Sequence, residues 1–315
     1  MMKHKYICLI FLCLYIFVGS TKNAYAYGIN VLNNQENLSN YNITMKRDLL
    51  CLMMAYPEHI VAIEKNSEDY VYIITKSGKK IIYDDKKKKS FQDKLLYPDL
   101  QDMMEQVYPL GSINKLMDEE FDPGRARVYA LLKDVYGVSK EQVQSNLTRV
   151  KVGYKYWDFN GENGAAESLK QVMKELIPIA EKRNDVCSYI FPTSGTFNYR
   201  YIAGTNQLSA HSFGTAIDLR SDKRDYWKWT SRKEGERRML SYPREIIEIF
   251  EKNNFIWGGK WGHFDILHFE YRPELIIKAK YFSNQLSPDK PWYSGIPCED
   301  DKTKNFIQII EEELK

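Results

Sequence analysis

Two short stretches of the chain hold side chains that could bind a metal ion together. The first is Ser209–Asp218, which reads Ser-Ala-His-Ser-Phe-Gly-Thr-Ala-Ile-Asp, and the second is Asp265-Ile-Leu-His268. They contain His211 and His268, two of only five histidines, and two carboxylates. Two imidazoles and one carboxylate can hold a zinc ion, and a second carboxylate can take the proton of a zinc-bound water. This set of residue types predicts a metal-dependent hydrolase.

The spacing of the first stretch predicts two ligands from one local unit. His211 and Asp218 are too far apart for one helical turn, and Gly214 between them permits a bend that a side chain would resist. A strand that starts at Thr215 could then return Asp218 to the side of His211. With His268 as third ligand, a tetrahedral Zn²⁺ keeps one position open for water.

The second stretch predicts a general base. Asp265 lies three residues before His268, where it could take a proton from water and return it to the leaving amine. The swapped assignment, with Asp265 as ligand and Asp218 as base, is also compatible with these residue types. His263 is a rival ligand, but it falls on the opposite strand face from His268 if 264–268 is extended, so we treat it as an outer residue.

Two further residues could contact a substrate. Arg200 lies just upstream of His211, where a guanidinium could offset the charge of a tetrahedral oxyanion or bind a substrate carboxylate. The alternative is an ordinary surface arginine. Ser209 could orient the substrate or bond to the backbone of its own loop.

The N-terminus is typical of a targeting segment. Lys3 and Lys5 precede an apolar run over 7–18, and Ala24-Tyr25-Ala26 is a small-x-small cleavage signal. The run would rise only ~18 Å as a helix, against a hydrocarbon core of ~30 Å. We therefore expect residues 1–26 to be a signal peptide, with an uncleaved anchor as the alternative. The expected location is secreted, in the cell envelope, with no stable membrane span after cleavage.

Charge and cysteine content exclude other classes. The 45 basic residues exceed the 42 acidic ones by three. Removal of residues 1–26 takes away three lysines and no acid, which leaves a balanced chain. Nucleic-acid binding is not expected, because it needs a net basic surface. The mature chain keeps Cys51, Cys187 and Cys298, which allow at most one disulfide.

The pattern of elements predicts an α+β chain. We expect a loose polar leader over 27–48, an N-terminal extension of unknown role over 27–150, and the catalytic domain over 151–315, although no linker marks that boundary. The expected strands are 70–74 and 80–83, which form a hairpin, and 150–157, 215–219 and 266–271. The expected helices are 125–136, one that opens at 139, 165–183, 243–253 and 273–280.

The residues of the two stretches resemble the M15 family of zinc peptidases. This family includes D-alanyl-D-alanine carboxypeptidases and dipeptidases of the VanY and VanX type and L-alanyl-D-glutamate endopeptidases. The resemblance is close over 209–218 and over Trp261–Glu270, which contains Asp-x-x-His-Phe-Glu. It implies an M15- and hedgehog-like domain, a small antiparallel sheet with flanking helices that carries the zinc site. It also implies the ligands His211, Asp218 and His268, the base Asp265, and Ser209 and Arg200 near the substrate.

The resemblance further implies a peptidoglycan stem peptide as substrate and partner. Aspartate at the base position, where the carboxypeptidases have glutamate, argues against a simple carboxypeptidase, so D,D-carboxypeptidase and L-Ala–D-Glu endopeptidase activities both stay open. The alternative is a non-catalytic protein that binds the cell wall and retains the zinc-peptidase fold. The sequence does not indicate an oligomeric state.

Overall fold

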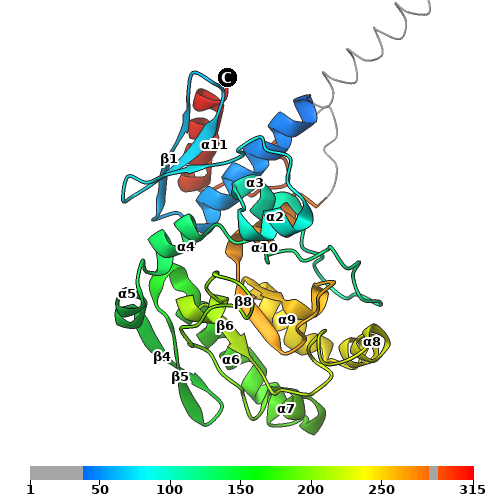
Figure 1. Ribbon diagram of the computed structural model, residues 1–315. Helices are drawn as coiled ribbons and strands as arrows, with labels where there is room; N and C mark the ends of the chain where they lie inside the picture. The colour runs from blue at the N-terminus through cyan, green and yellow to red at the C-terminus, as the bar shows by residue number, and fades with distance from the viewer. Residues whose placement is uncertain (1–37, 284–289) are drawn as a thin grey trace, which may run out of the picture. The chain divides into compact units, whose positions relative to one another are not determined.

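The computed structural model describes residues 38–283 and 290–315 (Figure 1). The expected signal peptide lies outside these residues. The chain divides into two compact units, 1–46 and 47–315. In the first unit the described residues 38–46 are helical, which corrects the leader expected over 27–48; its residues 27–37 lie outside the description. The many asparagines of this segment suggested a loop. They did not prevent a helix, because the helix propensity of single residues is weak compared with their structural context.

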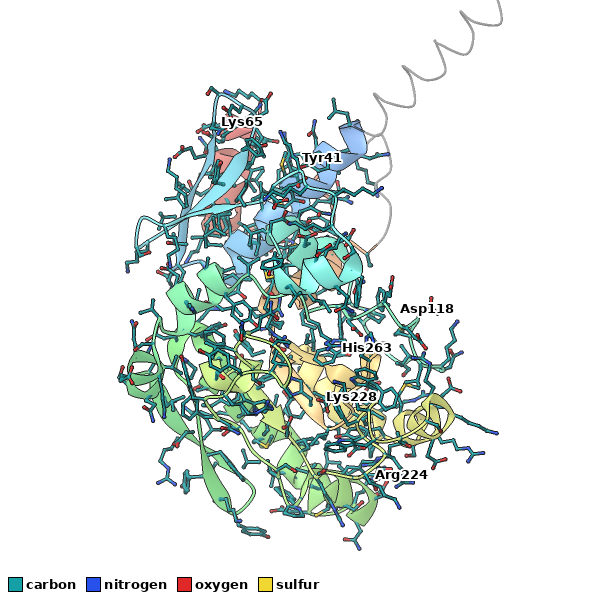
Figure 2. All side chains as sticks on the ribbon, in the orientation of Figure 1. Tyr41, Lys65, Asp118, Arg224, Lys228 and His263 are labelled. Carbon is teal, nitrogen blue, oxygen red and sulfur yellow. The ribbon has the colours of Figure 1, made fainter. Side chains whose placement is uncertain are left out.

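The second unit begins with helical residues 47–55 and a three-stranded antiparallel sheet. The hairpin predicted around Ser77-Gly78 is confirmed, and the edge strand β1 was not predicted. Helix α11 packs on β1, where the backbone N–H of Lys65 donates to Glu313 (2.7 Å; Figure 2). The elements are β1 (Ile60–Lys65), β2 (Val71–Thr75), β3 (Lys80–Ile82) and α11 (Asp301–Glu313).

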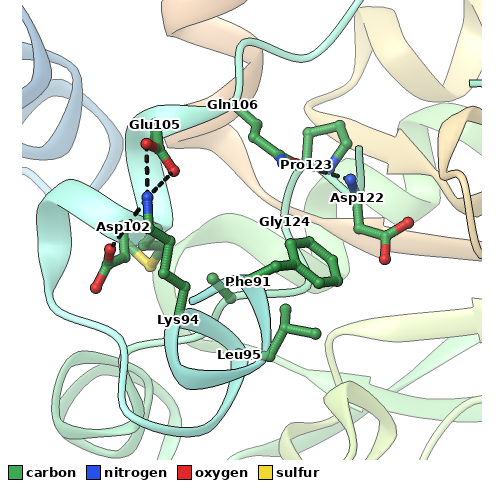
Figure 3. A pocket seen from close by; sticks show the side chains of 11 residues that line it. Phe91, Lys94, Leu95, Asp102, Glu105, Gln106, Asp122, Pro123 and Gly124 are labelled. Carbon is green, nitrogen blue, oxygen red and sulfur yellow. Dashed lines mark hydrogen bonds and ion pairs between the residues drawn. The ribbon is translucent and has the colours of Figure 1, made fainter. Parts of the chain in front are cut away.

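Two short helices, α2 (Phe91–Leu96) and α3 (Leu100–Glu105), follow this sheet. Each begins with a capping box, in which the cap side chain and the third helical residue satisfy each other's backbone N–H. These helices and the 122–126 segment line a cleft (Figure 3). The lining contains none of the predicted site residues.

Helix α4 (Tyr129–Tyr136) ends at Gly137, as predicted, but it begins four residues later than expected. The residues before it are not helical because they contact the second half of the chain, as described below. Ser139 caps α5 (Lys140–Ser145), which confirms the helix predicted there.

The strand expected over 150–157 is a hairpin instead, because Gly153 adopts a positive φ and reverses the chain. Helix α6 contains Pro178 and ends three residues before the predicted limit. The elements of this part are β4 (Leu147–Val152), β5 (Lys155–Asn160), α6 (Ala165–Ala180) and α7 (Asn184–Ile190).

The predicted ligands lie on or beside a second three-stranded antiparallel sheet, with strand order β6-β8-β7. Phe250 of α9 stacks on Phe269 of β8, with ring centroids 4.0 Å apart, and both side chains are fully buried. This contact fixes the sheet on its helix. The elements are β6 (Ala216–Asp218), α8 (Arg232–Leu240), α9 (Arg244–Lys252), β7 (Phe255–Trp257), β8 (His268–Tyr271) and α10 (Pro273–Tyr281).

Residues 108–127, which we call the strap, contact the segment between β7 and β8. The ammonium of Lys260 is buried and donates to the carbonyl of Pro109 (2.6 Å). A Cβ on Gly262 would lie 1.9 Å from the carbonyl oxygen of Asp118, so the two backbones meet only because position 262 has no side chain. The division of the chain at residue 150 stays a prediction. The residues before and after that position are in direct contact here.

The expected α+β class with small antiparallel sheets is confirmed. Within the described residues, none of the helices has both the length and the apolar character needed to span a membrane. The three cysteines of these residues are free thiols.

Candidate metal centre

A tight turn brings the first ligand into place. His211 lies in a 3₁₀ turn over Ala210–Phe213, which ends at Gly214 with φ of +67°. A Cβ on Gly214 would lie 2.7 Å from the Leu147 side chain and 3.2 Å from the backbone nitrogen of Asn160. Both the conformation and the space therefore require glycine, as the motif predicted, and the chain then enters β6.

Strand pairing brings the other two ligands together. Asp218 of β6 stands directly opposite His268 of β8 in the antiparallel register. Residues that face each other in such a ladder have side chains within contact distance. Asp218 and His268 are 50 positions apart in the sequence, and the β6–β8 ladder brings them side by side.

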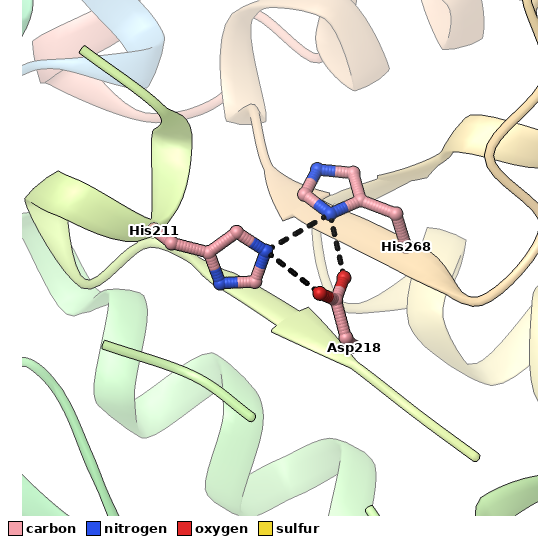
Figure 4. A group of neighbouring side chains, drawn as sticks. All are labelled: His211, Asp218 and His268. Atoms are coloured by element: carbon pink, nitrogen blue, oxygen red, sulfur yellow. Dashed lines mark hydrogen bonds and ion pairs between the residues drawn. The ribbon is translucent and has the colours of Figure 1, made fainter. Parts of the chain in front are cut away.

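The three side chains form one group, shown in Figure 4. The carboxylate of Asp218 faces both imidazoles, with Oδ1 2.9 Å from Nδ1 of His268 and Oδ2 3.2 Å from Nε2 of His211. The two imidazole nitrogens are 3.3 Å apart. One donor atom from each residue lies within 4.8 Å of the others.

The outer nitrogens of the two imidazoles have their own partners. Nδ1 of His211 is hydrogen-bonded to the carbonyl of Thr196, which leaves the lone pair of Nε2 for the group. Nε2 of His268 faces the carboxylate of Glu270 at 3.7 Å. Carbonyl and carboxylate partners of this kind fix the ring orientation of metal-binding histidines.

The electrostatics of the His211, Asp218 and His268 group favour a bound positive charge. Burial opposes ionisation of Asp218, but His211 and His268 outweigh it and hold the pKa of this carboxyl well below its usual range. Burial also opposes protonation of His268, but hydrogen bonds with Asp218 and Glu270 outweigh it and raise its pKa to about 10. Two nitrogen donors and an ionised carboxylate that attract a cation fit a zinc ion.

Asp265 lies at the end of the loop before β8, where its backbone N–H donates to the carbonyl of Gly258 (3.0 Å). Its side chain is half-buried. Burial raises the pKa of its carboxyl to about 6, with nearby His268 lowering it and Asp218 raising it. A raised pKa suits a group that must both take and return a proton near neutral pH.

The remaining predicted residues lie on the loop before His211. The backbone N–H of Arg200 donates to Oγ of Ser212 (2.9 Å), and the N–H of buried Ser209 donates to the carbonyl of Arg200 (3.0 Å). The guanidinium of Arg200 is exposed and is not part of the group. The contacts of Arg200 and Ser209 with a substrate stay predictions.

His263, the rival ligand, is also outside the group. The Nδ1 atom of His263, which is labelled in Figure 2, lies 2.7 Å from the carboxylate of buried Asp122. The His263 ring meets Trp227 edge-on and stacks on Phe91. Its expected position outside the ligand set agrees with this geometry.

Sequence reasoning missed Glu270 and its partner Arg127. Glu270 follows His268 by two residues, so period-two alternation in a strand would have placed both on one face. Arg127 carried no such signal, because 143 residues separate it from Glu270.

Residues 203–271 match the model of a peptidase family, Peptidase_M15_4, described as D-alanyl-D-alanine carboxypeptidase. This match confirms the resemblance to the M15 peptidases that was drawn from the motifs. The matched segment contains His211, Asp218, Asp265 and His268. Comparisons with curated proteins and with solved structures found no match.

Proposed function

We propose that this protein is a secreted, zinc-dependent peptidase that cuts the stem peptides of peptidoglycan. The observation that carries the proposal is the convergence of His211, Asp218 and His268, within 4.8 Å of one another, inside a segment of the M15 peptidase family. These three side chains would hold the zinc ion. A bound zinc ion supplies Lewis acidity, which polarises a carbonyl group and lowers the pKa of water.

The residues around the group would carry the proton transfers. Asp265 takes the proton of the attacking water as a C–O bond forms at the scissile carbonyl. It then returns that proton to the amide nitrogen as the C–N bond breaks, which releases a carboxylate and an amine. Arg200, whose guanidinium is exposed on the neighbouring loop, would offset the negative charge of the tetrahedral intermediate. Ser209 would orient the substrate from the same loop.

Mass spectrometry of defined muropeptides after incubation with zinc-loaded protein tests the proposal and identifies the bond. The expected result is cleavage that a chelator abolishes and zinc restores. An Asp265→Asn variant should still bind zinc and should lose at least about a hundredfold in rate, the lower range for a general base.

One outcome would refute the proposal, and another would refute only the role of Asp265. Muropeptides that bind tightly but stay intact with the zinc-loaded protein would favour the non-catalytic wall-binding alternative. Cleavage at the wild-type rate by the Asp265→Asn variant would leave hydrolysis in place and remove Asp265 from its role.

A further inference from the structure

Arg127 of the strap reaches the metal centre from outside the segment that matches the M15 family. Its guanidinium binds the carboxylate of Glu270 through two parallel hydrogen bonds, from Nε to Oε1 (2.9 Å) and from Nη2 to Oε2 (2.5 Å). Both side chains are almost fully buried, at 6 % and 1 % exposure. This fork geometry sets the position of a carboxylate as well as neutralising it.

The oxygen that receives the second of these bonds is the one that faces the metal group. Oε2 of Glu270 lies 3.7 Å from Nε2 of His268, and Nδ1 of the same ring faces Asp218. Glu270 lies two residues after His268 on β8, so both side chains project from the same face of the strand. Arg127, Glu270 and His268 therefore form a continuous buried chain of charges that ends in the metal group.

A second arginine shows what Arg127 adds. Arg272 approaches Oε1 of Glu270 at 3.4 Å, but its Nε is committed to Glu274 (2.6 Å). Arg272 thus contributes positive charge without contact at Oε2. Burial would raise the pKa of Glu270, but Arg127 outweighs it and lowers the pKa well below its usual range.

We propose that Arg127 is a positioning residue of the metal centre, which acts through Glu270 to fix the ring of His268 and to strengthen zinc binding. This inference rests on the proposed zinc site. It assigns the strap a role in metal binding, although the ligands themselves lie in the second half of the chain. Partners of a metal-binding histidine typically contribute 10–100-fold to metal affinity.

The test is the dissociation constant for zinc, measured on the whole chain by competition with a chromogenic chelator. Arg127→Met is expected to weaken zinc binding 10–100-fold. Arg127→Lys keeps the charge but loses the fork, so we expect a loss of at least about threefold. The double variant Arg127→Met/Glu270→Gln should bind zinc no more weakly than Glu270→Gln alone, because Arg127 acts through Glu270. The visible spectrum of the Co²⁺-loaded variants reports the ligand geometry independently of activity.

Lys278→Met is the matched control. Lys278 forms an equally buried ion pair with Asp48 (2.6 Å), and its ammonium also binds the carbonyl of Met104, away from the metal group. Loss of either cation removes the main cationic partner of a buried carboxylate and should destabilise the fold comparably. Lys278→Met should nevertheless keep the wild-type zinc affinity within twofold.

The outcomes separate this inference from the proposed function. If the wild-type chain binds no zinc, both fail. If the wild type binds zinc and folded Arg127→Met matches Lys278→Met in affinity, only the role of Arg127 fails. Should Arg127→Met not fold, Arg127→Lys decides in the same way: an affinity within twofold of Lys278→Met overturns the inference, and a loss of threefold or more supports it.

Discussion

Replacement of Asp265 by asparagine should stabilise the metal-free protein while it removes the proposed base. The folded-state pKa of Asp265 is about 6, against an ordinary value of 3.8. The folded state therefore holds this proton more tightly than the unfolded state, and ionisation costs stability as the pH rises from about 4 to about 6. At about 1.36 kcal/mol per pKa unit, the full penalty above this window is on the order of 3 kcal/mol. Asparagine has nearly the same shape and no charge, so it avoids this penalty.

Urea denaturation in the presence of a chelator measures this difference. At pH 7.5 the free energy of unfolding of Asp265→Asn should exceed that of the wild type by about 3 kcal/mol. At pH 4.5 most of Asp265 is protonated in the folded state, so the difference should shrink to about 1 kcal/mol. With saturating zinc it should also shrink at pH 7.5, because a nearby cation favours the ionised carboxylate.

The pH dependence decides between two explanations. A stabilisation of equal size at pH 7.5 and pH 4.5 would show that asparagine packs better, and the reasoning from ionisation would be wrong. A variant less stable than the wild type at pH 7.5 would refute the claim that burial penalises the ionised carboxylate.

Three other predictions follow from the same geometry. His211→Ala should lose stoichiometric zinc binding while the fold remains, as metal analysis and circular dichroism of the purified protein would show. Gly214→Ala should cost about 2–3 kcal/mol in urea denaturation and weaken zinc binding, whereas Gly204→Ala, which has a similar positive φ and open space, should cost only about 1 kcal/mol; equal losses would exclude the steric contribution. A chain that starts at residue 151 would lack the strap, so its thermal unfolding by circular dichroism should lose cooperativity; a sharp wild-type transition would contradict this.

The convergence of His211, Asp218 and His268 could be predicted from the sequence because the signals for it are local. Gly214 marks a turn that only glycine allows, and Asp218 and His268 each fall on a short predicted strand. Once these two strands are neighbours in one sheet, cross-strand pairing is enough to bring Asp218 and His268 together.

The less accurate predictions share a different cause. The hairpin of β4 and β5 was read as one strand because Gly153 was not weighed as a turn. Helix α4 begins later than predicted, and Arg127 just before it binds a partner 143 positions away. Contacts at such distances leave no periodicity in the sequence, so neither the strap nor the contact of Arg127 with Glu270 could be derived from spacing.

The close approach of Gly262 to Asp118 offers a way to weaken the contact between the strap and the β7–β8 segment. The change would add side-chain volume and leave every charge in place. A single methyl group at position 262 would act as a wedge between the two backbones, and no ionisable group would change. For the same reason, grafting the 203–271 segment into another scaffold would require a host loop that meets this bare glycine. A transferable form of this site is thus discontinuous in sequence, because it needs the sheet that carries the proposed ligands and also the strap, which lies far before that sheet in the chain.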